Sequence, residues 1–148
     1  MIQVIVENVS ITGIKLPEYK HPGDSGMDVR ADIEEPVTLK PLERRLISTG
    51  LKFKVPENIE IQVRPRSGLA LKKGVTVLNT PGTVDESYEG VVGVILINLS
   101  AEEVVINPGD RIAQLVFARV EKAELNLVAK ISESTERGSG GFGSSGIN

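Results

Sequence analysis

Carboxylates are the most numerous side chains of this chain that could carry acid–base chemistry, with 20 Asp and Glu residues. Among its 148 residues there is one histidine, His21, and no cysteine. A nucleophile activated by histidine, a thiolate nucleophile and a transition-metal site built from imidazoles are therefore not expected. Phosphate loops of the Walker type and glycine-rich dinucleotide motifs are also absent. Any reaction run by this chain would use an aspartate or glutamate as its general base.

A compact set of anion donors lies at residues 64–70 (Arg-Pro-Arg-Ser-Gly-Leu-Ala). Arg66, the Ser67 hydroxyl and the Gly68 amide stand at the expected start of a helix. Charge, hydrogen bonding and the helix dipole together favour a phosphate at such a place. An ordinary helix N-cap beside a surface arginine explains the same residues, and taken alone it is the simpler explanation.

A second segment with chemical potential spans residues 79–90 (Asn-Thr-Pro-Gly-Thr-Val-Asp-Glu-Ser-Tyr-Glu-Gly). The Pro-Gly pair predicts a turn, whose exposed main-chain groups could hydrogen-bond the edge of a base. Tyr88 could pack on a sugar, and Asp85 could orient a water molecule. The alternative is an ordinary hairpin with acidic surface residues.

Two shorter segments add polar candidates. Residues 23–31 (Gly-Asp-Ser-Gly-Met-Asp-Val-Arg-Ala) suggest a turn leading into a strand that carries Asp28, or else a loop of solvated acids. Residues 109–114 (Gly-Asp-Arg-Ile-Ala-Gln) follow a turn signal; Asp110 and Arg111 could pair, and Gln114 could reach a phosphate. In isolation, a turn followed by a core strand explains this second segment better.

The last twelve residues, 137–148, place Arg137 and Phe142 among glycines and serines. This composition is typical of a linker or a frayed terminus. A cation and a ring on flexible backbone would also suit an arm that captures a nucleotide. Ordering about ten residues costs on the order of 10 kcal/mol, whereas one stacked base returns about 1–3 kcal/mol. Closure of such an arm would therefore also need phosphate contacts.

The elements that must position these residues are predicted to be mostly short strands. Hydrophobic residues make up 40% of the chain and aromatic residues only 3%, which predicts an aliphatic core rich in β-branched residues. Strands are predicted at residues 2–6, 45–49, 51–55, 59–63, 75–78, 91–99 and 111–120, and one short helix at 67–73. The nearly all-apolar run at 91–99 suggests burial on both faces, so an oligomer is plausible.

Charge and hydropathy restrict the partners. The net charge of −3 argues against a broad surface for nucleic acid. Neither a signal peptide nor an apolar run of membrane-spanning length is apparent. We therefore expect a cytoplasmic protein that binds neither nucleic acid nor a membrane, and that holds any anion with a few placed cations.

Taken together and in this order, the five segments resemble the five motifs of the homotrimeric dUTP diphosphatases (dUTPases) over most of the chain. The resemblance implies an all-β, distorted jelly-roll-like barrel or sandwich with at most one short helix. It implies a homotrimer with shared active sites, a β domain at 1–130 and a Gly-rich arm at 131–148 that closes over a site. The implied reaction is Mg²⁺-assisted hydrolysis of dUTP to dUMP and diphosphate, which limits uracil incorporation into DNA and supplies dUMP for thymidylate synthesis.

The resemblance also assigns roles by position. Asp85 would be the base that activates water, Tyr88 would pack on deoxyribose, and Asp28 would support Mg²⁺ through water while substrate phosphates hold most of the metal. The implied uracil contacts are Asn79, Gly82, Thr83, Val84 and Gly93, and the implied phosphate contacts are Arg66, Ser67, Gly68 and Gln114. In the arm, Arg137 would bind the γ-phosphate, Phe142 would stack on uracil, and Gly143 and Ser144 would add phosphate contacts.

Two alternatives remain beside this hypothesis. A dCTP deaminase-like enzyme would share the architecture, but the segment at 66–70 lacks the arginine-rich character expected there. A non-catalytic nucleotide-binding regulator on the same fold would be expected to have lost Asp85 or the arm, and this chain has both.

Overall fold

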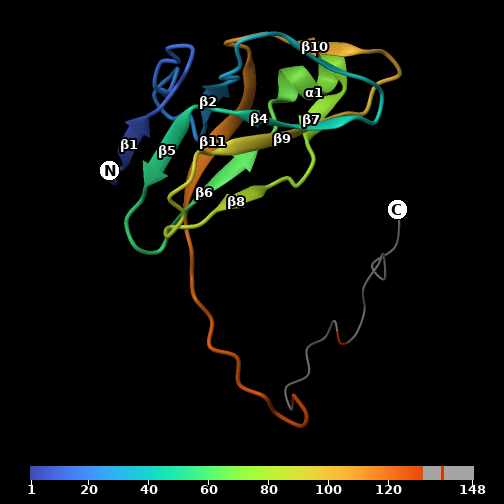
Figure 1. Ribbon diagram of the computed structural model, residues 1–148. Coiled ribbons are helices and arrows are strands. Elements are labelled where there is room, and N and C mark those ends of the chain that lie inside the picture. Colours follow the sequence, from blue (N-terminus) through green and yellow to red (C-terminus); the bar gives the residue numbers. More distant parts are fainter. Residues whose placement is uncertain (132–137, 139–148) are drawn as a thin grey trace.

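The computed structural model describes residues 1–131 and 138, and within them the chain forms eleven strands and one short helix (Figure 1). The all-β prediction is confirmed. The elements are β1 (Ile5–Asn8), β2 (Met27–Arg30), β3 (Val37–Leu39), β4 (Arg44–Ser48), β5 (Leu51–Lys54), β6 (Ile59–Arg64), α1 (Ser67–Lys73), β7 (Val75–Val77), β8 (Gly82–Val84), β9 (Gly93–Asn98), β10 (Val104–Ile106) and β11 (Arg111–Arg119).

Alternation of apolar and polar residues explains why the predicted strands form. In β6, Ile59, Ile61 and Val63 are buried while the residues between them are half-buried. The seven predicted strands all occur, each within three residues of its predicted ends. Three others, β3, β8 and β10, each three residues long, were not predicted.

Two antiparallel sheets pack around one aliphatic core (Figure 1). The larger has the strand order β2-β11-β6-β8, and the smaller has the order β4-β9-β7. The pairs β1–β5 and β3–β10 complete the sandwich. In β9 only alternate residues are fully buried, so its second face is merely half-buried within one chain. This corrects the expectation of burial on both faces for a single copy.

Helix α1 has the predicted bounds and links β6 to β7. It ends at Gly74, whose φ of 64° is in the left-handed region and whose amide donates to the Ala70 carbonyl. A Cβ at Gly74 would lie 2.9 Å from the Ser100 Cβ, so a side chain is excluded there for steric reasons as well. The sharp stop directs the chain straight into β7.

A buried carboxylate fastens the N-terminal loop to the strand region that carries Asp28. Asp32, only 4% exposed, accepts hydrogen bonds of 2.6 Å from both the Ser10 and the Thr12 hydroxyl. The Ile11 and Thr12 amides donate to it at 3.1 Å. Burial alone would raise the pKa of Asp32, but these four donors outweigh burial and hold the pKa below its ordinary value.

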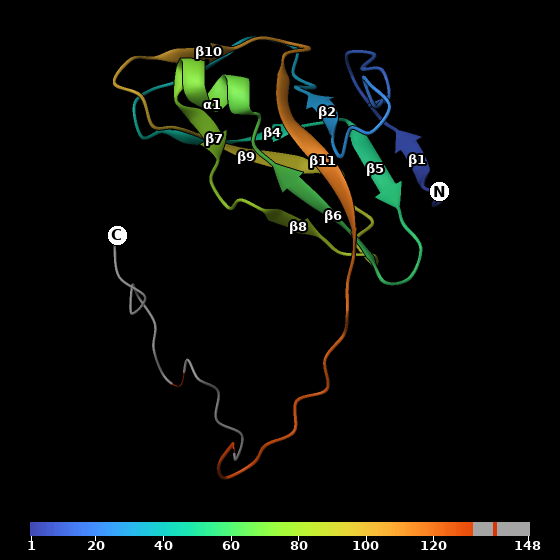
Figure 2. The same cartoon turned by 180° about the vertical axis from the view of Figure 1, so that it is seen from behind.

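The C-terminal segment leaves the sandwich after β11 and runs away from it (Figures 1 and 2). Its Leu125, Leu127 and Ile131 side chains are 92%, 101% and 80% exposed. Nothing in the described part of the chain covers these apolar groups. Apart from residues 131 and 138, the predicted arm at 131–148 lies outside the described residues. Helix α1, the helix within the described ranges, is too short to span a membrane.

Candidate functional site

An ion-paired cluster joins three of the sequence segments. The Asp28 carboxylate on β2 accepts a hydrogen bond from Arg66 Nε at 2.9 Å and one from Arg111 Nη1 at 3.1 Å. Arg66 Nη1 also donates to the Arg111 carbonyl at 3.2 Å. One carboxylate thus fixes two guanidinium groups in place, and the remaining N–H donors of both arginines are free for an anion.

Gln114 completes this cluster from the middle of the large sheet. In β11 it pairs with Asp28 of β2 on one side and with Arg64 of β6 on the other. Its side-chain Nε2 donates to the Pro65 carbonyl at 2.9 Å. A Cβ on Gly26 would collide with Gln114 Oε1 and lie 3.2 Å from Cδ. Gly26 is therefore needed for Gln114 to occupy this position.

The cluster lies in a hollow of about 700 Å³. Five cationic and three acidic side chains are among its lining residues, which include Lys15, Glu18, Lys20, Asp24 and Arg30 in addition to the cluster. The local excess of positive charge contrasts with the net negative charge of the whole chain. Such a hollow favours a polyanion of the size of a triphosphate.

The beginning of helix α1 lies beside this hollow. Arg66 is the N-cap residue, and no side chain caps the helix. The amides of Ser67 and Gly68 belong to the first turn, where no carbonyl inside the helix can accept from them. A Cβ built on Gly68 meets nothing within 4 Å, so the backbone is open to a ligand. Arg66 is thus both the N-cap residue of the helix and an ion-paired member of the cluster.

The second predicted segment forms a narrow turn between β7 and β8. Gly82 pairs with Val63 of β6. A Cβ at Gly82 would lie 3.2 Å from both Asn79 Nδ2 and the Val63 Cβ, so the backbone and the Asn79 amide approach each other closely. Thr83 is exposed and Val84 half-buried. A flat group such as a base edge could reach main-chain atoms here without meeting a side chain at position 82.

Asp85 and Tyr88 lie on the loop that follows β8. The Tyr88 amide donates to the Asp85 carbonyl at 3.1 Å, which closes a tight turn. Tyr88 Oη donates to the Val91 carbonyl at 3.1 Å, so the ring folds back over its own loop. The ring lies against Gly90, where a Cβ would come within 2.5 Å of Cζ. Asp85 is exposed and therefore available to a water molecule.

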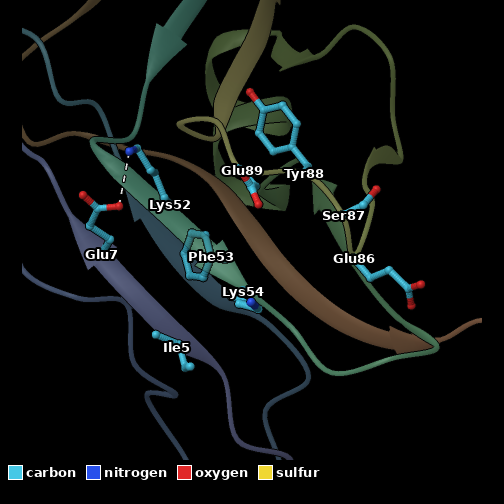
Figure 3. Close-up of a pocket in the computed structure, with 9 residues that line it drawn as sticks. All are labelled: Ile5, Glu7, Lys52, Phe53, Lys54, Glu86, Ser87, Tyr88 and Glu89. Atoms are coloured by element: carbon cyan, nitrogen blue, oxygen red, sulfur yellow. Dashed lines mark ion pairs between the residues drawn. The ribbon is translucent and has the colours of Figure 1, made fainter.

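Figure 3 shows this loop on one side of a pocket of about 500 Å³, with strands β1 and β5 on the other. Tyr88 borders the pocket opposite Lys52 and Phe53. Further along the chain, Gly93 begins β9, and a Cβ there would lie 2.6 Å from Leu46 Cδ1. The missing side chain at position 93 therefore makes room for Leu46 on the neighbouring strand.

Within one chain the predicted site residues form two separate groups. Asp28, Arg66 and Gln114 line one hollow, whereas Asp85 and Tyr88 line others that contain none of these three residues. Asp85 lies beside the start of β6, because Val84 pairs with Ile61, whereas Arg66 follows the end of that strand. Asp28 is also separated from Asp85 by the strand order β2-β11-β6-β8, in which β2 and β8 are opposite edges of the sheet. At about 4.8 Å between neighbouring strands, these edges are about 14 Å apart. The arm residues Arg137, Phe142, Gly143 and Ser144 lie outside the described residues.

One prediction about the cluster is wrong. Asp110 does not pair with Arg111; it accepts a hydrogen bond from the Asn107 amide at 2.8 Å and so shapes the turn before β11. Arg111 turns instead to Asp28, 83 residues away. The sequence suggests only its neighbour Asp110 as a partner of Arg111, and no local signal identifies the pairing of Arg111 with Asp28.

The described residues include oxygen atoms that could bind a metal, but no cluster of side chains that would surround one. No group of three or more His, Cys, Asp or Glu side chains that could hold a metal occurs in the described part of the chain. Asp28 uses one lone pair on each oxygen for an arginine, which leaves further acceptor sites for a bound water. This donor set fits Mg²⁺, which keeps several waters and binds substrate phosphates. It does not fit a tightly chelated metal.

Known proteins match most of the chain. The family model for dUTPase matches residues 12–146. The deoxyuridine 5'-triphosphate nucleotidohydrolase of Fusobacterium nucleatum subsp. nucleatum is 53% identical over 146 residues, 99% of both chains. That of Treponema denticola is 58% identical over 135 residues, 91% of this chain and 93% of the relative. The structure of the Staphylococcus bacteriophage 80alpha dUTPase G164S mutant with dUpNHpp has a TM-score of 0.84 at 27% identity, covering 98% of this chain and 99% of that one.

Proposed function

Because the chain belongs to the dUTPase family and has the activity of that family, dUTP hydrolysis, we propose that water attacks the α-phosphorus with Asp85 as general base. The water oxygen forms a bond to the α-phosphorus, and the bond from that phosphorus to the bridging oxygen breaks. Diphosphate leaves, dUMP remains, and Asp85 takes the proton of the water. The observation that most strongly supports hydrolysis of a triphosphate is the pair of arginines held by Asp28, because the pair forms an anion site that a triphosphate would occupy.

The phosphates lie against the cluster and the start of α1 in this proposal. Arg66 and Gln114 contact phosphate oxygens from their side chains, and Ser67 and Gly68 contact them from the first turn of the helix. Asp28 keeps Arg66 oriented while no substrate is bound. Preorganised donors of this kind need no rearrangement as charge develops in the transition state.

The nucleoside lies against the turn between β7 and β8. Asn79 and the main chain at Gly82, Thr83, Val84 and Gly93 contact uracil, and Tyr88 packs on the deoxyribose. Attractive contacts would distinguish thymine, with its additional methyl group, by only about 1–3 kcal/mol. The close approach of backbone and side chain at Gly82 instead offers a steric barrier to that methyl group.

Mg²⁺ is the proposed cofactor, and Mg²⁺ dependence is general in this family. The substrate phosphates would hold most of the ion, and Asp28 would contact it through water. When bound, Mg²⁺ would offset the negative charge of the triphosphate and so assist the departure of diphosphate. The residues of the chain contribute orientation and the proton acceptor.

A homotrimer with shared sites is the proposed assembly, because within one chain the phosphate cluster and Asp85 line separate hollows. The outer face of the β4-β9-β7 sheet offers an apolar surface to a neighbour. Leu46, 71% exposed, pairs with half-buried Ile95 on that face. The exposed Leu125 and Leu127 of the C-terminal segment also need a covering surface.

The arm at 131–148 is proposed to close over an assembled site, next to a β domain at 1–130. In it, Arg137 binds the γ-phosphate and Phe142 stacks on uracil, with Gly143 and Ser144 on phosphates. A cytoplasmic location is part of the same proposal.

The test is diphosphate release from dUTP, dCTP, dTTP and UTP, each with Mg²⁺ and with EDTA. We expect release from dUTP with Mg²⁺, and in ¹⁸O-labelled water we expect the label in dUMP. Label in diphosphate instead would place the attack on the β-phosphorus. Ammonia released from dCTP would favour the deaminase-like alternative, and binding of dUTP without turnover would favour the regulator.

A further inference from the structure

Glu86, the residue directly after Asp85, is held by two separate parts of the chain. Its Oε2 accepts a hydrogen bond of 2.7 Å from the Asn58 amide, and its Oε1 accepts one of 2.9 Å from Lys122 Nζ. The hydrogen bond from Lys122 and the one from Asn58 hold the pKa of Glu86 below its ordinary value, and Glu86 in turn raises the pKa of Lys122. Both groups are therefore charged at neutral pH.

Asn58 is the fixed point of this arrangement. It lies in the turn before β6 with a φ of 59°, in the left-handed region, where asparagine is tolerated better than most residues. Its carbonyl accepts from the Val120 amide at 3.0 Å, just after β11. Asn58 thus uses its carbonyl to hold the end of β11 and its amide to hold Glu86. The loop after β8 is thereby fastened to the two central strands of the large sheet, β6 and β11.

The contacts of Glu86 bear directly on Asp85. The two residues share a peptide bond, and both line one hollow of about 220 Å³ with Asn58, Val120 and Lys122. The turn closed by the Tyr88 amide and the Asp85 carbonyl fixes the other side of the loop. With Glu86 fastened, the peptide between residues 85 and 86 has little freedom to rotate. Without this contact the loop is held on one side only.

We propose that Glu86 is a positioning residue for the general base: its contacts with Asn58 and Lys122 fix the direction in which Asp85 presents its carboxylate. This inference rests on the proposed role of Asp85. The hydrogen bond from Asn58 carries most of the effect, because it joins Glu86 to backbone. The exposed ion pair with Lys122 carries less, since long side chains at a surface hold one another weakly.

Four variants separate these contributions. Glu86→Ala removes both contacts, whereas Glu86→Gln keeps an oxygen that can accept from the Asn58 amide. Lys122→Met removes the ion pair alone. Glu121→Gln removes a neighbouring acidic charge that has no partner within the described ranges, and so controls for charge. The readouts are kcat and KM for dUTP, the melting temperature, and hydrogen exchange of the Tyr88 amide.

We expect Glu86→Ala to lower kcat about 10-fold, because small misplacements of a catalytic group are costly, with KM changed less than about twofold. The kcat of Glu86→Gln should lie between those of Glu86→Ala and the wild type. The kcat of Lys122→Met should fall less than about fivefold. Exchange of the Tyr88 amide should accelerate in Glu86→Ala at an unchanged melting temperature, and Glu121→Gln should match the wild type.

Two outcomes would overturn the inference. One is a kcat for Glu86→Ala equal to that of Glu121→Gln; the other is a KM that rises while kcat stays constant. If Glu86→Ala proves unstable, Glu86→Gln and Lys122→Met are compared instead. A larger loss of kcat in Lys122→Met than in Glu86→Gln would then contradict the inference. Failure of the wild type to release diphosphate from dUTP would instead contradict the proposed function itself.

Discussion

Gly90→Ala should weaken the choice between deoxyribose and ribose without touching the substrate. An ideal Cβ at Gly90 would lie 2.5 Å from Tyr88 Cζ and 3.1 Å from Cε2. Ordinary contact begins near 3.4 Å, so the ring must move by about 1 Å or leave its place over the loop. Its hydrogen bond to the Val91 carbonyl would stretch or break with it.

A displacement of about 1 Å in a positioning group can cost up to about 100-fold in rate. We expect kcat/KM for dUTP to fall about 10-fold, which corresponds to about 1.4 kcal/mol of transition-state stabilisation. The value for UTP should change less, since the tyrosine ring is proposed to favour deoxyribose. The ratio of kcat/KM for dUTP to that for UTP is the quantity to measure, with the melting temperature as a check on folding.

Tyr88→Ala and the double variant Gly90→Ala/Tyr88→Ala complete a cycle for this effect. If Gly90 acts only through the ring, the double variant should equal Tyr88→Ala. An unchanged dUTP-to-UTP ratio in Gly90→Ala would refute the reasoning. So would a further loss when Gly90→Ala is added to Tyr88→Ala.

Three other changes test separate parts of the account. Asp32→Asn should lower the free energy of unfolding at neutral pH by about 2 kcal/mol, since a buried charged acceptor is lost. The stabilisation by Asp32 is fully present above its ordinary pKa of 3.8 and is lost as the pH falls through the lower pKa of the folded state. The variant should therefore lose less stability than the wild type on acidification. Leu46→Glu should convert trimers to monomers in light scattering and abolish turnover, because it places a charge on the apolar sheet face. Removal of residues 137–148 should weaken binding of a non-hydrolysable dUTP analogue about 10-fold or more while leaving dUMP binding unchanged, measured by calorimetry.

Each of these has a control and a contrary result. Glu34→Gln, an exposed acid near Asp32, should leave stability unchanged, and an Asp32→Asn chain with the acid sensitivity of the wild type would contradict the linkage. Leu71→Glu on α1 controls for the charge in Leu46→Glu, and trimers that survive Leu46→Glu would exclude that face as an interface. Equal loss of dUMP and analogue binding after truncation would contradict a triphosphate-dependent arm.

Local patterns predicted the elements but not the contacts between them. The alternation in β6 and the glycine after Lys73 identified a strand and a helix end, because both depend on neighbouring residues. The partners of Asp28 are 38 and 83 residues away, and those of Glu86 are 28 and 36 residues away. No spacing along one sequence specifies such pairs.

The family resemblance identified candidate site residues but not their arrangement within one chain. The wrong pairing of Asp110 with Arg111 illustrates the limit. Successive residues entering a strand point in opposite directions, so neighbours in sequence rarely meet there. Conversely, Asp85 and Arg66 lie apart because β6 and β8 are antiparallel: Val84 pairs with Ile61 near the start of β6, whereas Arg66 follows the end of that strand. The sequence did not show this, because β8 was not predicted.

Complementation between two inactive chains tests the central claim most directly. Asp85→Asn should lose turnover while still binding nucleotide, and Arg66→Ala should lose phosphate binding. If each site takes Arg66 from one subunit and Asp85 from another, unfolding and refolding the two variants together yields sites with both residues intact. Random assembly then predicts about a quarter of the wild-type rate of diphosphate release. A mixture no more active than its separate components would contradict a site shared between subunits.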